Sequence, residues 1–312
     1  MKTGILIIIF LAINLIVKAQ QDPQFSQNMF NHMTVNPAFA GLQNKWVISG
    51  IYRNQWQSMP DAPETYALNV DAPLRIVGRD GGFGVNVLKD KLGLQSALQI
   101  MLNYSFKQTF RWGVWSVGIK VGIVNEKIGA DWYIPESGEH KPVMDDPALN
   151  QEDVSKILFD MGAGTFLTGE NFYTGLAVSH LTKPRFTIGQ SGEFFLTPHL
   201  YWTGGYAFRL TPVWEIQPSA FVVTDFVSAQ YTLNANAVYK KRLWGGVSYR
   251  WEDAVVFMGG VMFRNLAMGY SYDWSVSEVG KYTGGSHEVT LSYCFGQQSE
   301  KRRKIYKSVR FL

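Results

Sequence analysis

The chain has 312 residues, of which 46% are hydrophobic, 14% aromatic and only 17% charged. That charged fraction is low beside the roughly 25% of ordinary soluble domains, and the single cysteine, Cys294, excludes an intramolecular disulfide. Residues 300–312 hold six basic residues and one acid, whereas the formal net charge of the whole chain is +4. The rest of the chain is therefore slightly negative, and its charge does not favour a nucleic-acid partner.

Residues 1–19 have the features of a cleavable signal peptide. Lys2 gives a positive start, residues 5–17 form an apolar core, and Val17-Lys18-Ala19 provides a cleavage site. A retained membrane anchor is the alternative, but the apolar run is short for a membrane span. No later run of 18 apolar residues follows, so we expect no transmembrane helix in the mature chain.

Residues 20–44 form a segment that differs in composition from both of its neighbours. Its central part, DPQFSQNMFNHMTVNPAFAG at 22–41, has neither helical nor strand periodicity, and Asn36-Pro37 favours a turn or extended backbone. Its Phe and Met residues are too apolar for a solvated linker. We therefore expect it to pack at the periplasmic mouth of a barrel or inside the lumen, as a plug or partner-binding segment. The residues predicted for this role are Asp22, Phe25, Met29, Phe30, Asn36, Pro37, Phe39 and Gly41.

From residue 45 to 296 the hydrophobic period is two. About fourteen candidate strands follow one another, each near the 9–11 residues that a tilted strand needs to cross a bilayer. They lie at about 45–53, 64–72, 81–89, 95–107, 112–124, 156–167, 171–180, 196–209, 213–223, 230–240, 243–251, 254–263, 266–273 and 286–296. The pattern predicts an all-β protein, a transmembrane outer-membrane β-barrel of about 14 antiparallel strands.

The chemistry of the two strand faces favours a membrane barrel over a soluble β-sandwich, which also alternates. One face carries Leu, Ile, Val and Ala in mid-strand and Tyr, Trp and Phe near the strand ends, as in the aromatic girdles of outer-membrane barrels. The other face is polar and suits a wet or plugged lumen. The polar residues predicted to face the lumen are Asn103, Arg209, Asn234, Asn236, Arg250, Asp273 and Glu288.

The connections indicate an orientation. Links after even-numbered strands are short, whereas the long links, at 54–63, 125–155, 181–195 and 274–285, follow odd-numbered strands. Bacterial outer-membrane barrels have short periplasmic turns and longer extracellular loops, so we expect both termini in the periplasm. Pro218 interrupts one strand, and we expect a β-bulge there, because a closed barrel has no free edge for a proline.

Candidate chemistry is sparse. The Gly-rich stretches at 81–84 and 162–164 lack the helix and Lys-Ser/Thr pair of a phosphate loop, and the acidic residues between 145 and 153 match no calcium-loop spacing. The five histidines show no ligand spacing, so no catalytic, cofactor-binding or metal-binding residue is predicted. The tail at 297–312, with Lys301, Arg302, Arg303 and Lys304, is predicted to be periplasmic. It could contact anionic lipid, peptidoglycan or a partner, or be a disordered tail.

Five stretches carry a resemblance to a known family. They are DPQFSQNMFNHMTVNPAFAG at 22–41, GGFGVNVLKDKLG at 81–93, GLAVSHLTK at 175–183, PHLYWTGGYAF at 198–208 and YTGGSHEVTLSY at 282–293. Together they resemble the PorP/SprF family of type IX secretion outer-membrane proteins, over the whole mature chain. The long basic tail departs from the family pattern.

The resemblance implies a non-enzymatic, cofactor-free barrel that works with the type IX export machinery. The implied partners are outer-membrane lipid, a secreted cargo such as a large cell-surface adhesin bound through its C-terminal domain, and other type IX components, including a periplasmic peptidoglycan-binding lipoprotein. The implied roles are export or surface anchoring of that cargo, which links the family to adhesion and gliding motility. The alternative is a passive outer-membrane channel or small-molecule transporter. An outer-membrane lipid hydrolase is disfavoured because no plausible Ser/His arrangement is present.

Overall fold

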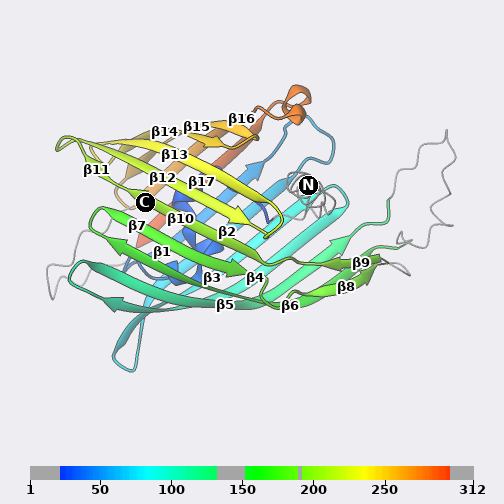
Figure 1. Cartoon of the computed structure of the whole chain (residues 1–312), viewed down its shortest axis with the longest axis horizontal. Coiled ribbons are helices and arrows are strands. Elements are labelled where there is room, and N and C mark those ends of the chain that lie inside the picture. Colours follow the sequence, from blue (N-terminus) through cyan, green and yellow to red (C-terminus); the bar gives the residue numbers. More distant parts are fainter. Residues whose placement is uncertain (1–21, 132–151, 189–191, 296–312) are drawn as a thin grey trace, which may run out of the picture.

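A computed structural model describes residues 22–131, 152–188 and 192–295, and these form a closed antiparallel barrel of fourteen strand positions around an internal segment (Figure 1). The strands are β1 Trp46–Asn54, β2 Glu64–Ile76, β3 Arg79–Leu92, β4 Gln95–Thr109, β5 Gly113–Ile128, β6 Val154–Gly169, β7 Phe172–Ser179, β10 His199–Tyr206 continued by β11 Phe208–Arg209, β12 Trp214–Thr224, β13 Ala229–Tyr239, β14 Leu243–Arg250, β15 Ala254–Phe263, β16 Leu266–Ser275 and β17 Ser286–Phe295.

Each strand pairs with its sequence neighbour, and the barrel closes where β1 pairs with β17 from Trp46↔Phe295 to Asn54↔His287. The prediction of a barrel of about 14 antiparallel strands is thereby confirmed. The chain also forms a separate two-stranded sheet, β8 Arg185–Ile188 and β9 Gly192–Phe195, in the connection between β7 and β10. The sequence pattern did not indicate this hairpin. A short 3-10 helix, η5 Glu278–Tyr282, lies in the connection between β16 and β17.

The outer face of the barrel is apolar. Leu102, Ile119 and Leu233 are exposed in mid-strand, and exposed aromatic side chains such as Trp214 and Trp251 lie near the strand ends. Leu, Ile and Val between two belts of aromatic residues are typical of a lipid-facing surface. Within the described residues, no helix is both long and apolar enough to cross a membrane.

The predicted bulge at Pro218 is wrong. Pro218 pairs with Ala235 of β13 in an unbroken register. On its other side the pairing stops after Ser219↔Gly205 and resumes at Ile216↔Phe208 without any inserted residue. The neighbouring strand position is interrupted instead, between β10 and β11, where the N–H of Ala207 donates to the carbonyl of Asn171. A proline has no backbone N–H to donate to a neighbouring strand. Because the pairing with β10 and β11 is interrupted opposite Pro218, no N–H is needed at that position.

The N-terminal segment lies inside the barrel and contains three short helices, η2 Asn28–Phe30, α2 His32–Val35 and η3 Pro37–Phe39 (Figure 1, dark blue). Its first described residue, Asp22, contacts His180 and lies near His199, on either side of the long connection between β7 and β10. Gly41, near its other end, contacts Asp71 of β2 and Lys107 of β4, toward the short turns. The segment therefore runs through the lumen from the long-loop end to the short-turn end.

The exposed apolar face generates a stability prediction. Leu233 is 60% exposed in the middle of β13, so Leu233→Arg places a cation in the hydrocarbon region. We expect it to lower the free energy of unfolding by roughly 2–4 kcal/mol, measured by denaturant titration of protein folded into lipid vesicles. Leu233→Ala, which introduces no charge, is the control, and equal losses for the two variants would contradict a lipid-facing position.

Candidate functional site

The first anchor of the lumen segment is a buried carboxylate on β17. The backbone N–H groups of Ser26 and Gln27 donate to the two oxygens of Glu288, at 2.7 and 2.9 Å. The Ser26 hydroxyl donates to Asp273 of β16 at 2.6 Å. Neither carboxylate is more than 2% exposed. The turn at Ser26 and Gln27 belongs to no sheet or long helix, so its N–H groups have no partner among the described residues of the segment. Buried backbone groups must be hydrogen-bonded, and here the carboxylate of Glu288 in the barrel wall accepts these bonds.

Two arginines balance these carboxylates. Arg53 of β1, 1% exposed, bonds Asp273 at 2.8 Å, the Ser26 hydroxyl at 2.6 Å and Glu288 at 3.4 Å. Arg250 of β14 pairs with Asp253 at 2.8 Å and Asp273 at 3.4 Å. Removing one member of a buried charge network leaves its partner uncompensated, which typically costs about 3–5 kcal/mol. The network therefore specifies where Ser26 sits.

Below this anchor, amide side chains connect the segment to the wall. Asn69 of β2 donates to the side chains of Asn31 and Thr34, at 3.0 and 3.1 Å, and accepts from Asn86 of β3 at 2.6 Å. On the opposite wall, the Asn234 amide donates to Asn28 at 3.3 Å. Asn234 also bonds Ser219 and Ser248 of the adjacent strands.

Apolar side chains of the segment fill the remaining space. Met29 is fully buried against Val238, Trp244 and Val256, and Phe30 meets the Trp244 ring edge-on at 4.6 Å between centroids. Phe25 packs in a separate cluster with Ile51, Ala67 and Leu88.

An aromatic cluster surrounds His32. Its ring lies 5.0–5.4 Å from the rings of Phe39, Phe166 and Tyr173. Burial lowers the pKa of His32 to about 3, so the imidazole is neutral at physiological pH. His32 therefore acts here as a packing group rather than as a charge.

Glycines in the wall permit close approach of the segment. A Cβ atom on Gly118 of β5 would lie 2.5 Å from the backbone nitrogen of Ala38, and one on Gly82 of β3 would overlap the Ala40 carbonyl. Asn36 caps η3 by accepting from the N–H of Ala38 at 3.0 Å, and its amide donates to two wall carbonyls. Pro37 begins this helix, and Gly41, with φ +66°, ends the segment against Asp71.

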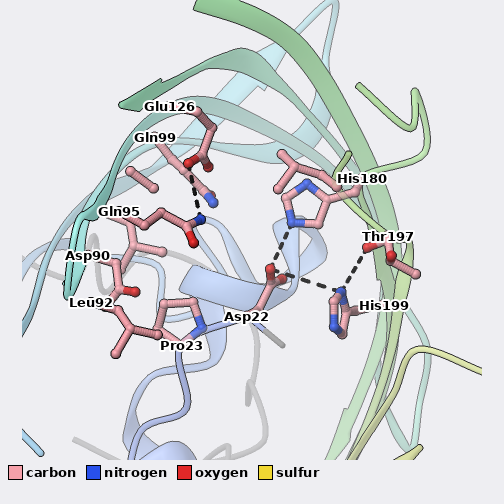
Figure 2. Close-up of a pocket in the computed structure, with 13 residues that line it drawn as sticks. Asp22, Pro23, Asp90, Leu92, Gln95, Gln99, Glu126, His180, Thr197 and His199 are labelled. Carbon is pink, nitrogen blue, oxygen red and sulfur yellow. Dashed lines mark hydrogen bonds and ion pairs between the residues drawn. The ribbon is translucent and has the colours of Figure 1, made fainter. Parts of the chain in front are cut away.

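At the long-loop end, Asp22 is held by side chains of two strand ends (Figure 2). Its Oδ1 lies 2.9 Å from Nε2 of His180, whose Nδ1 lies 2.7 Å from Asp160 of β6. The Tyr201 hydroxyl and the Ser179 hydroxyl donate to Oδ2 of Asp22.

The pKa values of Asp22 and His180 reflect their mutual contact. Burial alone would raise the pKa of Asp22, but the charge and hydrogen bond of His180 hold it well below its ordinary value. Burial alone would lower the pKa of His180, but Asp22 and Asp160 raise it to about 10. The imidazole is therefore a cation between two carboxylates.

The predicted site residues fall into three groups in the structure. All of the segment residues lie within the lumen, and among the lumen-facing residues Asn103, Asn234, Asn236, Arg250, Asp273 and Glu288 are buried. Arg209 is exposed on β11, which ends at one of the short turns. The tail residues Lys301, Arg302, Arg303 and Lys304 lie outside the described residues.

Several important residues were not singled out from the sequence. Arg53 and Ser26 belong to the charged anchor, and His180, His199 and Tyr201 surround Asp22. One feature of the sequence could have indicated His180, His199 and Tyr201. These residues fall in two of the stretches that carry the family resemblance, at 175–183 and 198–208.

The charged anchor generates a prediction. Glu288→Ala removes the acceptor of two backbone N–H groups and one partner of Arg53, so we expect a loss of about 3–5 kcal/mol in the free energy of unfolding. We also expect protease cleavage within residues 22–42, identified by mass spectrometry. Glu193→Ala is the matched control, because Glu193 is an exposed glutamate whose contact with Arg185 is 3.6 Å long, and exposed pairs contribute at most about 1 kcal/mol. A loss no greater than that of the control would show that Glu288 does not anchor the segment.

Among solved structures, the chain is similar to a Pseudomonas aeruginosa FadL homologue at 10% identity, with a TM-score of 0.46 over 89% of this chain and 96% of that one. It is also similar to the translocator domain of the autotransporter NalP from Neisseria meningitidis at 11% identity, with a TM-score of 0.42 over 80% and 88% of the two chains. These likenesses are too distant to carry a functional argument. No curated protein matches the sequence.

The family comparison is more informative. Residues 17–293 match the family described as type IX secretion system membrane protein PorP/SprF. The match spans the N-terminal segment and nearly all of the barrel, in agreement with the resemblance found in the sequence. The chain therefore belongs to the PorP/SprF family of type IX secretion system membrane proteins and is an outer-membrane β-barrel.

Proposed function

We propose that this barrel is a closed, non-enzymatic component of the type IX secretion system that assists export or surface anchoring of a cargo protein. The observation that carries the proposal is the filling of the lumen by residues 22–42, which contact the wall from the Asp22 end to the Gly41 end. A barrel of fourteen strands is wide enough for water or a plug. A plug of this extent favours holding a protein over conducting solutes.

The proposed orientation follows from the loops. The long connections that join β1 to β2, β5 to β6, β7 to β10 and β16 to β17 all begin and end at one end of the barrel, and long loops of outer-membrane barrels are extracellular. In this orientation β17 ends toward the periplasm, and we propose the same side for the basic tail. The first described residue, Asp22, then lies at the outer end of the lumen, whereas the sequence predicts a periplasmic N-terminus.

The proposed partners divide between the two ends. The long-loop end, where the segment closes the lumen, is the place for a cargo domain, and a large adhesin C-terminal domain is the occupant that the family suggests. The short-turn end faces the periplasm, where peptidoglycan-binding and motor components would be contacted. Neither role requires a catalytic group or cofactor.

A pair of glycine variants tests whether the segment seals the lumen. Gly118→Val places a side chain where the backbone of Ala38 now lies, so we expect it to displace the segment and produce ion conductance in planar bilayers that the wild-type protein lacks. Gly50→Val is the matched control, because a Cβ atom at Gly50 of β1 meets nothing within 4 Å. Both changes place a β-branched residue in a strand, which strands favour. Equal conductance of the two variants would contradict a seal at this position.

Deletion of residues 22–40, with the signal peptide retained, tests the function itself. We expect the variant to make cells permeable to small antibiotics and to lose or degrade the surface-displayed partner. Full display of the partner would refute a role of the segment in export or anchoring. Increased permeability with normal display would favour a channel that is merely gated by the segment. Heat-dependent migration of the barrel in electrophoresis verifies that the deleted protein still folds.

A further inference from the structure

Three potential metal ligands converge at the long-loop end of the lumen (Figure 2). Asp22 comes from the N-terminal segment, His180 follows β7, and His199 begins β10, and one ligand atom from each lies within 4.8 Å of the other two. Oδ1 of Asp22 is 2.9 Å from Nε2 of His180 and 3.9 Å from Nδ1 of His199. Ligand atoms around tetrahedral zinc lie about 3.3 Å apart, given bonds of about 2.0–2.1 Å. Asp22 and His180 are therefore close to the spacing that zinc requires, whereas the His199 ring must turn to bring its unprotonated nitrogen to the ion.

Two of the three donors are oriented by further groups. Nδ1 of His180 bonds Asp160 at 2.7 Å, which is the carboxylate–histidine arrangement common beneath metal-binding imidazoles. Oδ2 of Asp22 accepts from the Tyr201 and Ser179 hydroxyls, which leaves Oδ1 toward the histidines.

His199 carries a buried nitrogen for which the described residues provide no partner, which is an independent indication that an ion binds here. It is 2% exposed, and its Nδ1 donates to the Thr197 carbonyl at 2.8 Å. Its Nε2 is buried and has no hydrogen-bond partner among the described residues. A neutral imidazole that donates from Nδ1 carries its lone pair on Nε2, and burying such an acceptor unsatisfied is costly. Zinc binding requires the ring to turn so that this nitrogen meets the ion.

The surroundings favour a divalent cation. A cavity of about 140 Å³ is lined by Asp22, His180 and His199 and also by Asp90 and Glu126. Asp90 accepts from Thr65 and Glu126 from Gln95, and neither forms an ion pair within the described part of the chain. The cavity offers a route for the ion and space for a water as a fourth ligand.

We propose that Asp22, His180 and His199 form a zinc site that fastens the start of the N-terminal segment to the barrel wall. Zinc takes the place of the proton between Asp22 and His180, so binding releases that proton to solvent. The ion joins the outermost described residue of the segment to both sides of the β7–β10 connection. Zinc is assigned over calcium because two of the three ligands are imidazoles, whereas calcium prefers oxygen ligands.

The test uses the purified full-length protein in detergent, freed of metal with EDTA and titrated with zinc chloride by calorimetry. We expect one zinc ion per chain, and slower protease cleavage within residues 22–42 in its presence. His199→Ala should abolish both effects, and Asp160→Asn should weaken zinc affinity about 10- to 100-fold. His199 makes no close ion pair in the metal-free protein, so its variant is expected to fold, which electrophoretic migration verifies.

His287→Ala is the matched control, because His287 contacts Tyr270 on the opposite face of β17 from the buried Glu288. It should bind zinc as the wild type does. Substoichiometric binding, unchanged binding by His199→Ala, or loss of binding in His287→Ala would each overturn the proposal. So would binding of calcium chloride that His199→Ala leaves intact, since that would assign the cavity carboxylates to an oxygen-ligated ion. The readouts involve no cargo, so the outcome is independent of the proposed role in secretion.

Discussion

The structure depends on how an irregular segment satisfies its polar groups inside a barrel. Residues 22–42 contain only three short helices, so many of their backbone groups have no partner within a helix or sheet. Buried N–H and C=O groups must nevertheless be paired. The wall provides the partners: Glu288 for two N–H groups, Ser105 for the Ala40 carbonyl and Lys107 for the Gly41 carbonyl. The polar inner face is therefore complementary to one segment rather than generally wet.

The same constraint accounts for the mixture of side chains in the lumen. A buried ion network contributes little net stability compared with apolar packing, and its clearest benefit is to specify one arrangement. The apolar contacts of Met29 and Phe30 would tolerate small displacements along the barrel axis. The anchor of Ser26 to Asp273 and Glu288 does not, because a displaced segment would leave both carboxylates and Arg53 with fewer partners. Apolar packing therefore buries most of the segment, and the charged anchor determines its position along the barrel axis.

The sequence was sufficient to predict the strands of the barrel wall, but not the contacts that join the wall to the N-terminal segment. Strand alternation is a local pattern, so all fourteen strand positions could be located from it. The anchor joins Ser26 to Glu288 across 262 positions, and no spacing rule predicts such a contact. Arg53 lies in β1, where the alternation is weak, and His180 and His199 are separated by a hairpin that the pattern did not indicate. Parity placed Arg209 on the polar face, but it lies at the end of its strand and is exposed.

The attachment of the segment at both ends determines how easily the lumen could open. A plug tethered at one end can swing out and leave a pore. Here Asp22 is held at the long-loop end, whereas Gly41 is held at the other end and continues directly into β1 at Trp46. Opening the lumen would require the Asp22 contacts, the Ser26 anchor and the amide contacts of Asn31 to break together. Since each leaves buried polar groups unpaired, this opening is costly. The contacts therefore favour a lumen that stays closed.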